Sequence, residues 1–172
     1  MYEQYWDGEN WLKVIKDDDT IMYFFNRKLH RNDGPAMIVY SKNGSIIAKV
    51  FYKNNKLHRI DGPAEICYTE SGIIFNKIYY INGKIHRENG PSEIWYFTDG
   101  NVEYEEFRIN DKYHRLNGPA FIEYYSNGVI LTKEYFYNGK KIDLENLPFH
   151  FPIDTDKKIL YLSLKHGDIT DE

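Results

Sequence analysis

A motif repeated four times at a period of 28 residues constrains the fold of this chain more than any other feature. The motif reads His-Arg-x-Asp/Asn-Gly-Pro-Ala/Ser, and its histidines are His30, His58, His86 and His114. A fixed period of roughly 20–50 residues marks a repeat architecture, in which each unit buries its apolar surface against the next. We therefore expect a single domain built around four repeats in residues 30–141.

The residues between the motifs predict two antiparallel strands in each repeat. Alternate positions after each Gly-Pro hardly change, for example Ala64, Ile66 and Tyr68, and a period of two indicates a strand with one face inward. This run ends at Asn-Gly, Asp-Gly or Ser-Gly, a strong short-range hairpin signal. The predicted fold is all-β, a repetitive antiparallel meander of stacked hairpins with about eight strands in the repeats. Its expected buried row is Ile38, Ile66, Ile94 and Ile122.

Both ends of the chain depart from the repeat. Residues 1–29 are predicted to form a degenerate half-repeat that caps the N-terminal side, because terminal repeats in stacked arrays are atypical. Residues 142–172 lack the motif and are predicted to form an irregular C-terminal cap. Within this cap, residues 159–164 fit either an edge strand or a short helix.

The loops that carry the motif are predicted to be structural. Asp or Asn followed by Gly-Pro favours a tight loop, and we expect Gly62 to need a positive φ. Each histidine is expected to bond to backbone across the turn. A shared metal ion is excluded, because equivalent residues lie about 9.6 Å apart, two strand spacings, and ligands lie about 2.0–2.1 Å from an ion. The structural loop residues are His30, His58, His86, His114, Gly34, Gly62, Gly90, Gly118, Pro35, Pro63, Pro91 and Pro119.

Composition narrows the class of protein. A net charge of −4 argues against a general binder of nucleic acid or acidic membranes. The single cysteine, Cys67, cannot form an intramolecular disulfide, which predicts a reducing compartment such as the cytoplasm. The sequence shows no secretion signal, no apolar span of about 20 residues and no phosphate loop, dinucleotide fingerprint or zinc spacing. We therefore expect no catalysis, cofactor or metal, with Cys67 as an apolar filler and Glu103, Glu105 and Glu106 on a solvated face.

Basic residues recur along the loop edge. An edge of this kind could hold phosphate or carboxylate groups. Alternatively, each arginine pairs with an aspartate of its own loop, Asp33 or Asp61, or bonds loop carbonyls. Asn89 and Asn117 replace the aspartate in the last two loops. The candidate anion-binding residues are Arg31, Arg59, Arg87, Arg115, Lys56, Lys84 and Lys112.

Aromatic residues mark a candidate partner surface on the face opposite the isoleucine row. The positions facing this way differ in every repeat, and in the last two repeats they include Trp95, Phe97, Phe121 and Tyr125. Aromatic residues dominate interface hot spots, and an exposed apolar patch usually marks an interaction site. The alternative is that residues 142–172, with Leu147, Phe149, Phe151 and Leu160, fold back over this patch.

The segment Tyr79-Tyr80-Ile81-Asn82-Gly83-Lys84-Ile85-His86 resembles the MORN repeat, Tyr-x-x-Gly-x-x-His-Gly-x-Gly, with Arg in place of the Gly after His. The longer variant His-Arg-x-Asp-Gly-Pro-Ala is similar to repeats in proteins of giant DNA viruses and some bacteria. The resemblance covers roughly residues 21–141. It implies a non-enzymatic, elongated antiparallel sheet that scaffolds protein complexes or touches acidic lipids, in the host cytoplasm if the protein is viral.

These observations predict a non-catalytic scaffold or adaptor that binds another protein. A second possibility is an anion-binding module that docks on acidic phospholipid or nucleic acid through its basic loop edge. A third is an enzyme whose site lies in the C-terminal segment.

Overall fold

The computed structural model describes residues 2–6, 11–17 and 19–143, and in this part every regular element is a strand. The N-terminal strands are β1 (Tyr2–Trp6), β2 (Trp11–Lys16), β3 (Thr20–Phe25) and β4 (Lys28–Leu29). The long strands of the repeats are β5 (Met37–Tyr40), β6 (Ile46–Val50), β9 (Glu65–Tyr68), β10 (Ile74–Ile78), β13 (Glu93–Tyr96), β14 (Val102–Glu106), β17 (Phe121–Tyr124) and β18 (Ile130–Tyr137). The short strands are β7 (Tyr52–Lys53), β8 (Lys56–Leu57), β11 (Tyr80–Ile81), β12 (Lys84–Ile85), β15 (Arg108–Ile109), β16 (Lys112–Tyr113) and β19 (Lys140–Ile142).

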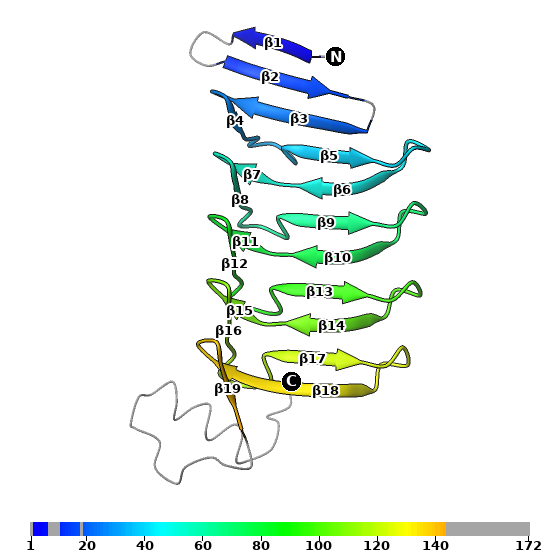
Figure 1. Ribbon diagram of the computed structural model, residues 1–172, viewed down its shortest axis with the longest axis vertical. Coiled ribbons are helices and arrows are strands. Elements are labelled where there is room, and N and C mark those ends of the chain that lie inside the picture. Colours follow the sequence, from blue (N-terminus) through cyan, green and yellow to red (C-terminus); the bar gives the residue numbers. More distant parts are fainter. Residues whose placement is uncertain (1, 7–10, 18, 144–172) are drawn as a thin grey trace.

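The main sheet is an open antiparallel meander. Its strands lie in the order β1-β2-β3-β5-β6-β9-β10-β13-β14-β17-β18-β19, and β4 pairs with β3 beside this path (Figure 1). Strands along this path follow one another in the chain, apart from the short strands that lie outside it, so no crossover interrupts the sheet. The predicted all-β meander is confirmed.

Each of the first three repeats contains four strands, two more than we predicted. The returning strand of the first repeat, β6, ends just before Phe51. The chain then leaves the main sheet to form the short hairpin of β7 and β8. Asn54 and Asn55 both have positive φ, 53° and 65°, which suits a tight turn between two-residue strands. The eight long strands match the predicted number, and the six strands of the separate short hairpins are additional. Figure 1 shows these hairpins stacked along one side of the sheet, at the end opposite the turns of the long hairpins.

A β-bulge shifts the register near the turn of every long hairpin. In the second repeat Tyr68 pairs with Ile74 and Cys67 with Asn76, which leaves Phe75 as the extra residue. The other hairpins shift at the equivalent place. A bulge re-aims the side chains beside it, and here it brings Phe75 within reach of the next repeat.

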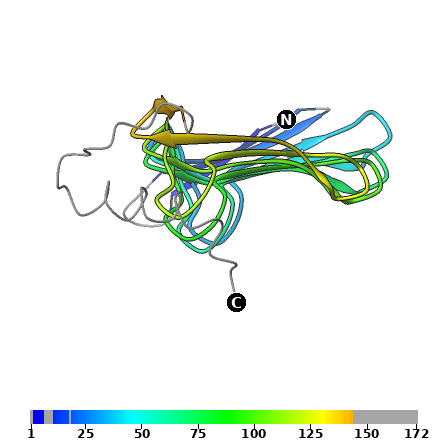
Figure 2. The same ribbon diagram turned by 90° about the horizontal axis from the view of Figure 1, so that it is seen from below.

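The expected buried isoleucine row is wrong in two respects. Of its four members only Ile122 is buried, and the other three are half-buried. The isoleucines also alternate across the sheet with charged residues of the returning strands, namely Lys49, Lys77, Glu105 and Lys133. The reason is architectural: the sheet is one layer thick, as the view in Figure 2 shows, and the motif loops project from one side near one end. The fully buried positions are Ala36, Ala64, Ser92 and Ala120, where the chain enters the sheet from these loops.

Candidate functional site

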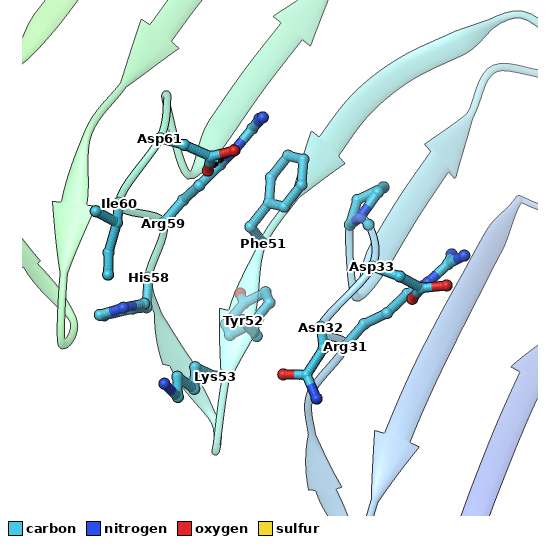
Figure 3. A pocket seen from close by; sticks show the side chains of 12 residues that line it. Arg31, Asn32, Asp33, Phe51, Tyr52, Lys53, His58, Arg59, Ile60 and Asp61 are labelled. Atoms are coloured by element: carbon cyan, nitrogen blue, oxygen red, sulfur yellow. Dashed lines mark hydrogen bonds and ion pairs between the residues drawn. The ribbon is translucent and has the colours of Figure 1, made fainter.

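The arginines of the motif loops stack on aromatic rings of the sheet. Arg59 Cζ lies 4.1 Å from the centroid of the Phe51 ring, and Arg59 Nε donates to Asp61 Oδ1 at 3.0 Å (Figure 3). Arg31 and Asp33 repeat this arrangement in the preceding loop, with an Nε–Oδ1 distance of 2.8 Å. The predicted pairing of each arginine with its own loop's aspartate is thus confirmed in the first two repeats. It lowers the pKa of both aspartates.

The glycine beside each arginine is required for space, and the predicted positive φ of Gly62 is wrong. Of the four motif glycines only Gly90 has a positive φ, 109°. A Cβ built on Gly62 would lie 3.1 Å from Arg59 Cζ, closer than ordinary van der Waals contact. Glycine therefore lets the backbone pass directly over the guanidinium group, which is held between the loop and the Phe51 ring.

The histidines join the motif loops to the hairpins that end the same repeats. The backbone N–H of Asn82 donates to His58 Nδ1 at 3.1 Å, and Asn138 bonds to His114 in the same way at 3.2 Å. The predicted bond to backbone is confirmed in these loops, but it reaches the hairpin at the end of the same repeat, 24 residues on, instead of crossing its own turn. Over residues 2–6, 11–17 and 19–143, no group of three His, Cys, Asp or Glu side chains is arranged to hold a metal ion.

Grooves separate neighbouring motif loops. The groove between the first two loops has a volume of about 550 Å³ and is lined by Arg31, Asp33, Arg59 and Asp61, among others (Figure 3). The groove between the last two loops, about 730 Å³, is lined by both Arg87 and Arg115, and Asn89 and Asn117 stand where the first groove has its aspartates. Arg87 Nη1 donates to the Pro91 carbonyl at 2.9 Å. The predicted lysines Lys56, Lys84 and Lys112 are exposed on the short hairpins and do not line these two grooves.

The sheet face opposite the isoleucines carries a continuous run of aromatic side chains. We call Phe75, Trp95, Tyr104 and Phe121 the aromatic run; successive ring centroids lie 5.9, 5.6 and 5.9 Å apart. All four side chains are half-buried, so each remains partly accessible. The run crosses β10, β13, β14 and β17.

The four predicted partner residues fall into two places. Trp95 and Phe121 belong to the aromatic run, whereas Phe97 and Tyr125 lie where the chain enters the turns of the third and fourth long hairpins, and Tyr125 is 52% exposed. Sequence reasoning missed Tyr104, which lies directly across from Trp95 on the returning strand. It also missed Phe75, whose position depends on the bulge.

Carboxylates surround the aromatic run, and we call this side of the sheet the carboxylate face. Cross-strand pairs show that its glutamates share one face: Glu93 lies directly opposite Glu106, and Glu123 opposite Tyr104. Like charges directly opposite each other destabilise a sheet. Burial raises the pKa of Glu93, and the charges of Glu106 and Glu65 raise it further. The hydrogen bond that Trp95 Nε1 donates to Glu93 Oε1 at 2.7 Å acts in the opposite direction.

Glu106 is buried, which corrects its predicted place on a solvated face. Its carboxylate accepts hydrogen bonds at 2.7 Å from both Arg108 Nε and the Tyr113 hydroxyl. Arg108 stands where the earlier repeats have Tyr52 and Tyr80, so this ion pair is special to the third repeat. A buried carboxylate needs such partners because removal from water is costly.

Cys67 lies on the same face, across from Asn76. Burial raises the pKa of the Cys67 thiol to about 11, and the charge of Glu65 contributes. The thiol is therefore protonated near neutral pH, a form that is a poor nucleophile.

In comparisons with known proteins, neither a family model nor a curated protein matches this chain. Within the described ranges, no helix has the length and apolar character needed to cross a membrane.

Proposed function

We propose that this protein is a non-catalytic scaffold that binds another protein through the carboxylate face. The aromatic run carries this proposal: four half-buried rings cross four neighbouring strands of a sheet that is one layer thick. Rings that stay partly accessible can be buried further by a partner, and aromatic residues contribute most to interface affinity. The MORN-like resemblance is compatible with such a role.

The distribution of repeated and variable residues supports the same face. The motif loops repeat the same contacts: the arginines stack on rings, and the histidines bond to the backbone of the hairpin that ends the repeat. The aromatic run is not periodic, because its four members occupy four non-equivalent positions of the 28-residue repeat. Residues that break a repeat without serving its stacking are suited to recognising a specific partner.

Site-specific photocrosslinking tests the proposal with a matched control. A photoreactive amino acid at position 121 faces the carboxylate side, whereas the same group at Tyr124 faces the isoleucine side of the same strand. We expect defined protein adducts in an extract of the native host from position 121 and few from position 124. Adducts of equal yield from both positions, or none from position 121, would contradict the proposal.

The predicted alternative, in which residues 142–172 cover the aromatic run, lies outside the described residues. A variant that ends at Asp143 separates the two ideas. A covering role predicts aggregation or unfolding of the shortened protein, because an apolar patch would be uncovered. A partner surface predicts a folded variant that keeps its crosslinks at position 121. The proposed enzymatic site in this segment also lies outside the described residues.

We also propose anion binding at the last two motif loops as a second candidate function. It is favoured by Asn89 and Asn117, which leave the groove beside Arg87 without the aspartates of the first groove. A phosphate binder loses affinity steeply as salt rises. Binding to acidic liposomes or nucleic acid at low salt, reduced in an Asn89→Asp variant, is the expected result. No binding at low salt, where surface electrostatics are strongest, would exclude this function.

A further inference from the structure

The two faces of the sheet carry opposite charges. The carboxylate face bears Glu65, Glu93, Glu106, Glu123 and Glu134 on the cross-strand rows that hold Trp95 and Phe121. The isoleucine face bears Lys49, Lys77 and Lys133, with Glu105 as its acidic member. Among the paired residues of the long repeat strands, the carboxylates are therefore concentrated on the face that carries the aromatic run.

Within the described residues, three of these five glutamates have no ion-pair partner. Arg108 pairs with Glu106, and Lys141 pairs with Glu134 at 2.6 Å. Within the part of the chain that the structure describes, no cation forms an ion pair with Glu65, Glu93 or Glu123. Glu93 and Glu106 moreover face each other across neighbouring strands; the charge of Arg108 offsets part of their repulsion, and a cation from outside would offset it further.

The protein already contains the arrangement that such a cation would form. In its motif loops the arginine guanidinium groups lie 3.9–4.1 Å above aromatic rings, and Arg31 and Arg59 also bond a carboxylate. On the carboxylate face the rings of Trp95 and Tyr104 lie beside the carboxylates of Glu93 and Glu123, and no cation of the described residues stacks on either ring. Cations bind best to the faces of Trp and Tyr rings.

The spacing of the aromatic run suits an extended chain. Side chains on one side of an extended segment are about 6.6–6.8 Å apart, close to the 5.6–5.9 Å between successive ring centroids. A segment that follows the ring centroids from β10 to β17 would place alternate side chains near successive rings and their flanking carboxylates.

We propose that the carboxylate face binds an extended segment of a partner protein that is rich in arginine or lysine at alternate positions. This inference rests on the proposed protein-binding function and adds the chemistry of the partner. The rings contact the cationic side chains, and Glu93 and Glu123 supply the charge that selects basic over neutral segments.

Peptide binding to the full-length protein tests this inference. The probe is a labelled peptide of alternating Arg and Thr, about nine residues long, which spans about 30 Å when extended; its control has Glu in place of Arg. We measure affinity by fluorescence anisotropy at low salt. Replacing both Glu93 and Glu123 by Gln should weaken binding about tenfold, or about 1.4 kcal/mol. Glu105→Gln, the matched control on the opposite face of β14, should change affinity by less than about twofold.

The glutamine variants should keep the fold, because the amide oxygen introduced by Glu93→Gln can still accept the Trp95 Nε1 hydrogen bond; Glu123→Gln alone serves as a second variant. Equal weakening by Glu105→Gln would show that only net charge matters, and absence of peptide binding, or equal binding of the acidic control, would also overturn the inference. If the crosslinks at position 121 persist unchanged in the double glutamine variant, the protein-binding function stands and the basic-segment inference falls. If position 121 gives no crosslinks at all, the function itself falls.

Discussion

Ser92 and Asn76 show two outcomes of placing a polar side chain in the buried part of a one-layer sheet. Ser92 replaces the alanine of the other repeats, and its Oγ donates to the Glu106 carbonyl at 3.0 Å and accepts from the Arg108 N–H at 2.9 Å. Asn76 is only 2% exposed, yet its Nδ2 has no hydrogen-bond partner in the described structure. An unsatisfied buried amide costs about 1–3 kcal/mol.

We predict that Asn76→Val stabilises the protein. The substitution removes the unpartnered amide, introduces a residue favoured in strands and keeps a similar volume. The free energy of unfolding in urea should rise by about 1 kcal/mol. A loss of similar size would instead indicate that a bound water satisfies the Asn76 amide.

Gly62→Ala should destabilise the protein by about 1 kcal/mol, because the new Cβ crowds the Arg59 guanidinium group between the loop and the Phe51 ring and displaces it from its stacked position. A double-mutant cycle isolates this cause. In an Arg59→Ala background the added methyl group meets no guanidinium, so the effect of Gly62→Ala should largely disappear. Equal losses in both backgrounds would point to backbone strain instead of the contact with Arg59.

The raised pKa of Glu93 predicts a pH dependence of stability. Since the folded state binds this proton more tightly than the unfolded state, ionised Glu93 destabilises the fold, and stability is lost as pH rises from the ordinary glutamate value through the raised pKa. Glu93→Gln should therefore be more stable than the natural protein at neutral pH, and this difference should shrink as the pH is lowered through the raised pKa. Urea unfolding at several pH values measures it; a difference that stays constant would contradict the assignment.

At the scale of strands and hairpins, the long strands could be predicted and the short ones could not. Period-two alternation and Asn-Gly turns have strong local signals, and they locate pairs such as β9 and β10. A two-residue strand such as β7 has no periodicity to detect. Outside the main sheet, the Tyr52 carbonyl of β7 accepts a hydrogen bond from the Arg31 backbone N–H of the preceding motif loop, a contact between residues distant in the sequence. The bulge at Phe75 likewise gives no signal in the sequence, because every repeat has an equivalent bulge and the period of 28 residues is unchanged.

His58→Ala should loosen the hairpin of β11 and β12. The Asn82 N–H loses its acceptor, His58 Nδ1, so its hydrogen exchange should accelerate about tenfold, corresponding to about 1.4 kcal/mol. The Gly83 N–H of the same hairpin bonds the Leu57 carbonyl at 2.8 Å and is the internal control, because its acceptor is unchanged. Unchanged exchange at Asn82 would show that the histidine does not hold the hairpin.

At the scale of the whole molecule, half of the candidate site was predictable. Trp95 and Phe121 stand out because they interrupt a repeat, and this is visible in the sequence. The opposite charges of the two faces become visible only when the strands are paired, because Glu93 and Glu106 are 13 residues apart in the chain and directly opposite in the sheet. Residue spacing alone cannot show which glutamates share a face once a bulge lies between them.

Stacked repeats contact only their neighbours, so one complete repeat should be removable. Deleting residues 58–85 joins Leu57 to His86 and brings β6 beside β13. The register supports this pairing, because Lys49 pairs with Ile66 and Lys77 pairs with Ile94 at equivalent positions, and the new sheet would pair Lys49 with Ile94.

The shortened protein should remain folded, with a β-type far-UV spectrum and a urea m-value lower by about a sixth, since m scales with the surface exposed on unfolding. The matched control deletes residues 58–73, which removes β9 alone and leaves β10, a strand parallel to β6, as the next long strand in the chain. We expect that control to unfold, because the motif loops and short hairpins would no longer meet. Unfolding of the 28-residue deletion would instead show that stability depends on contacts beyond nearest neighbours.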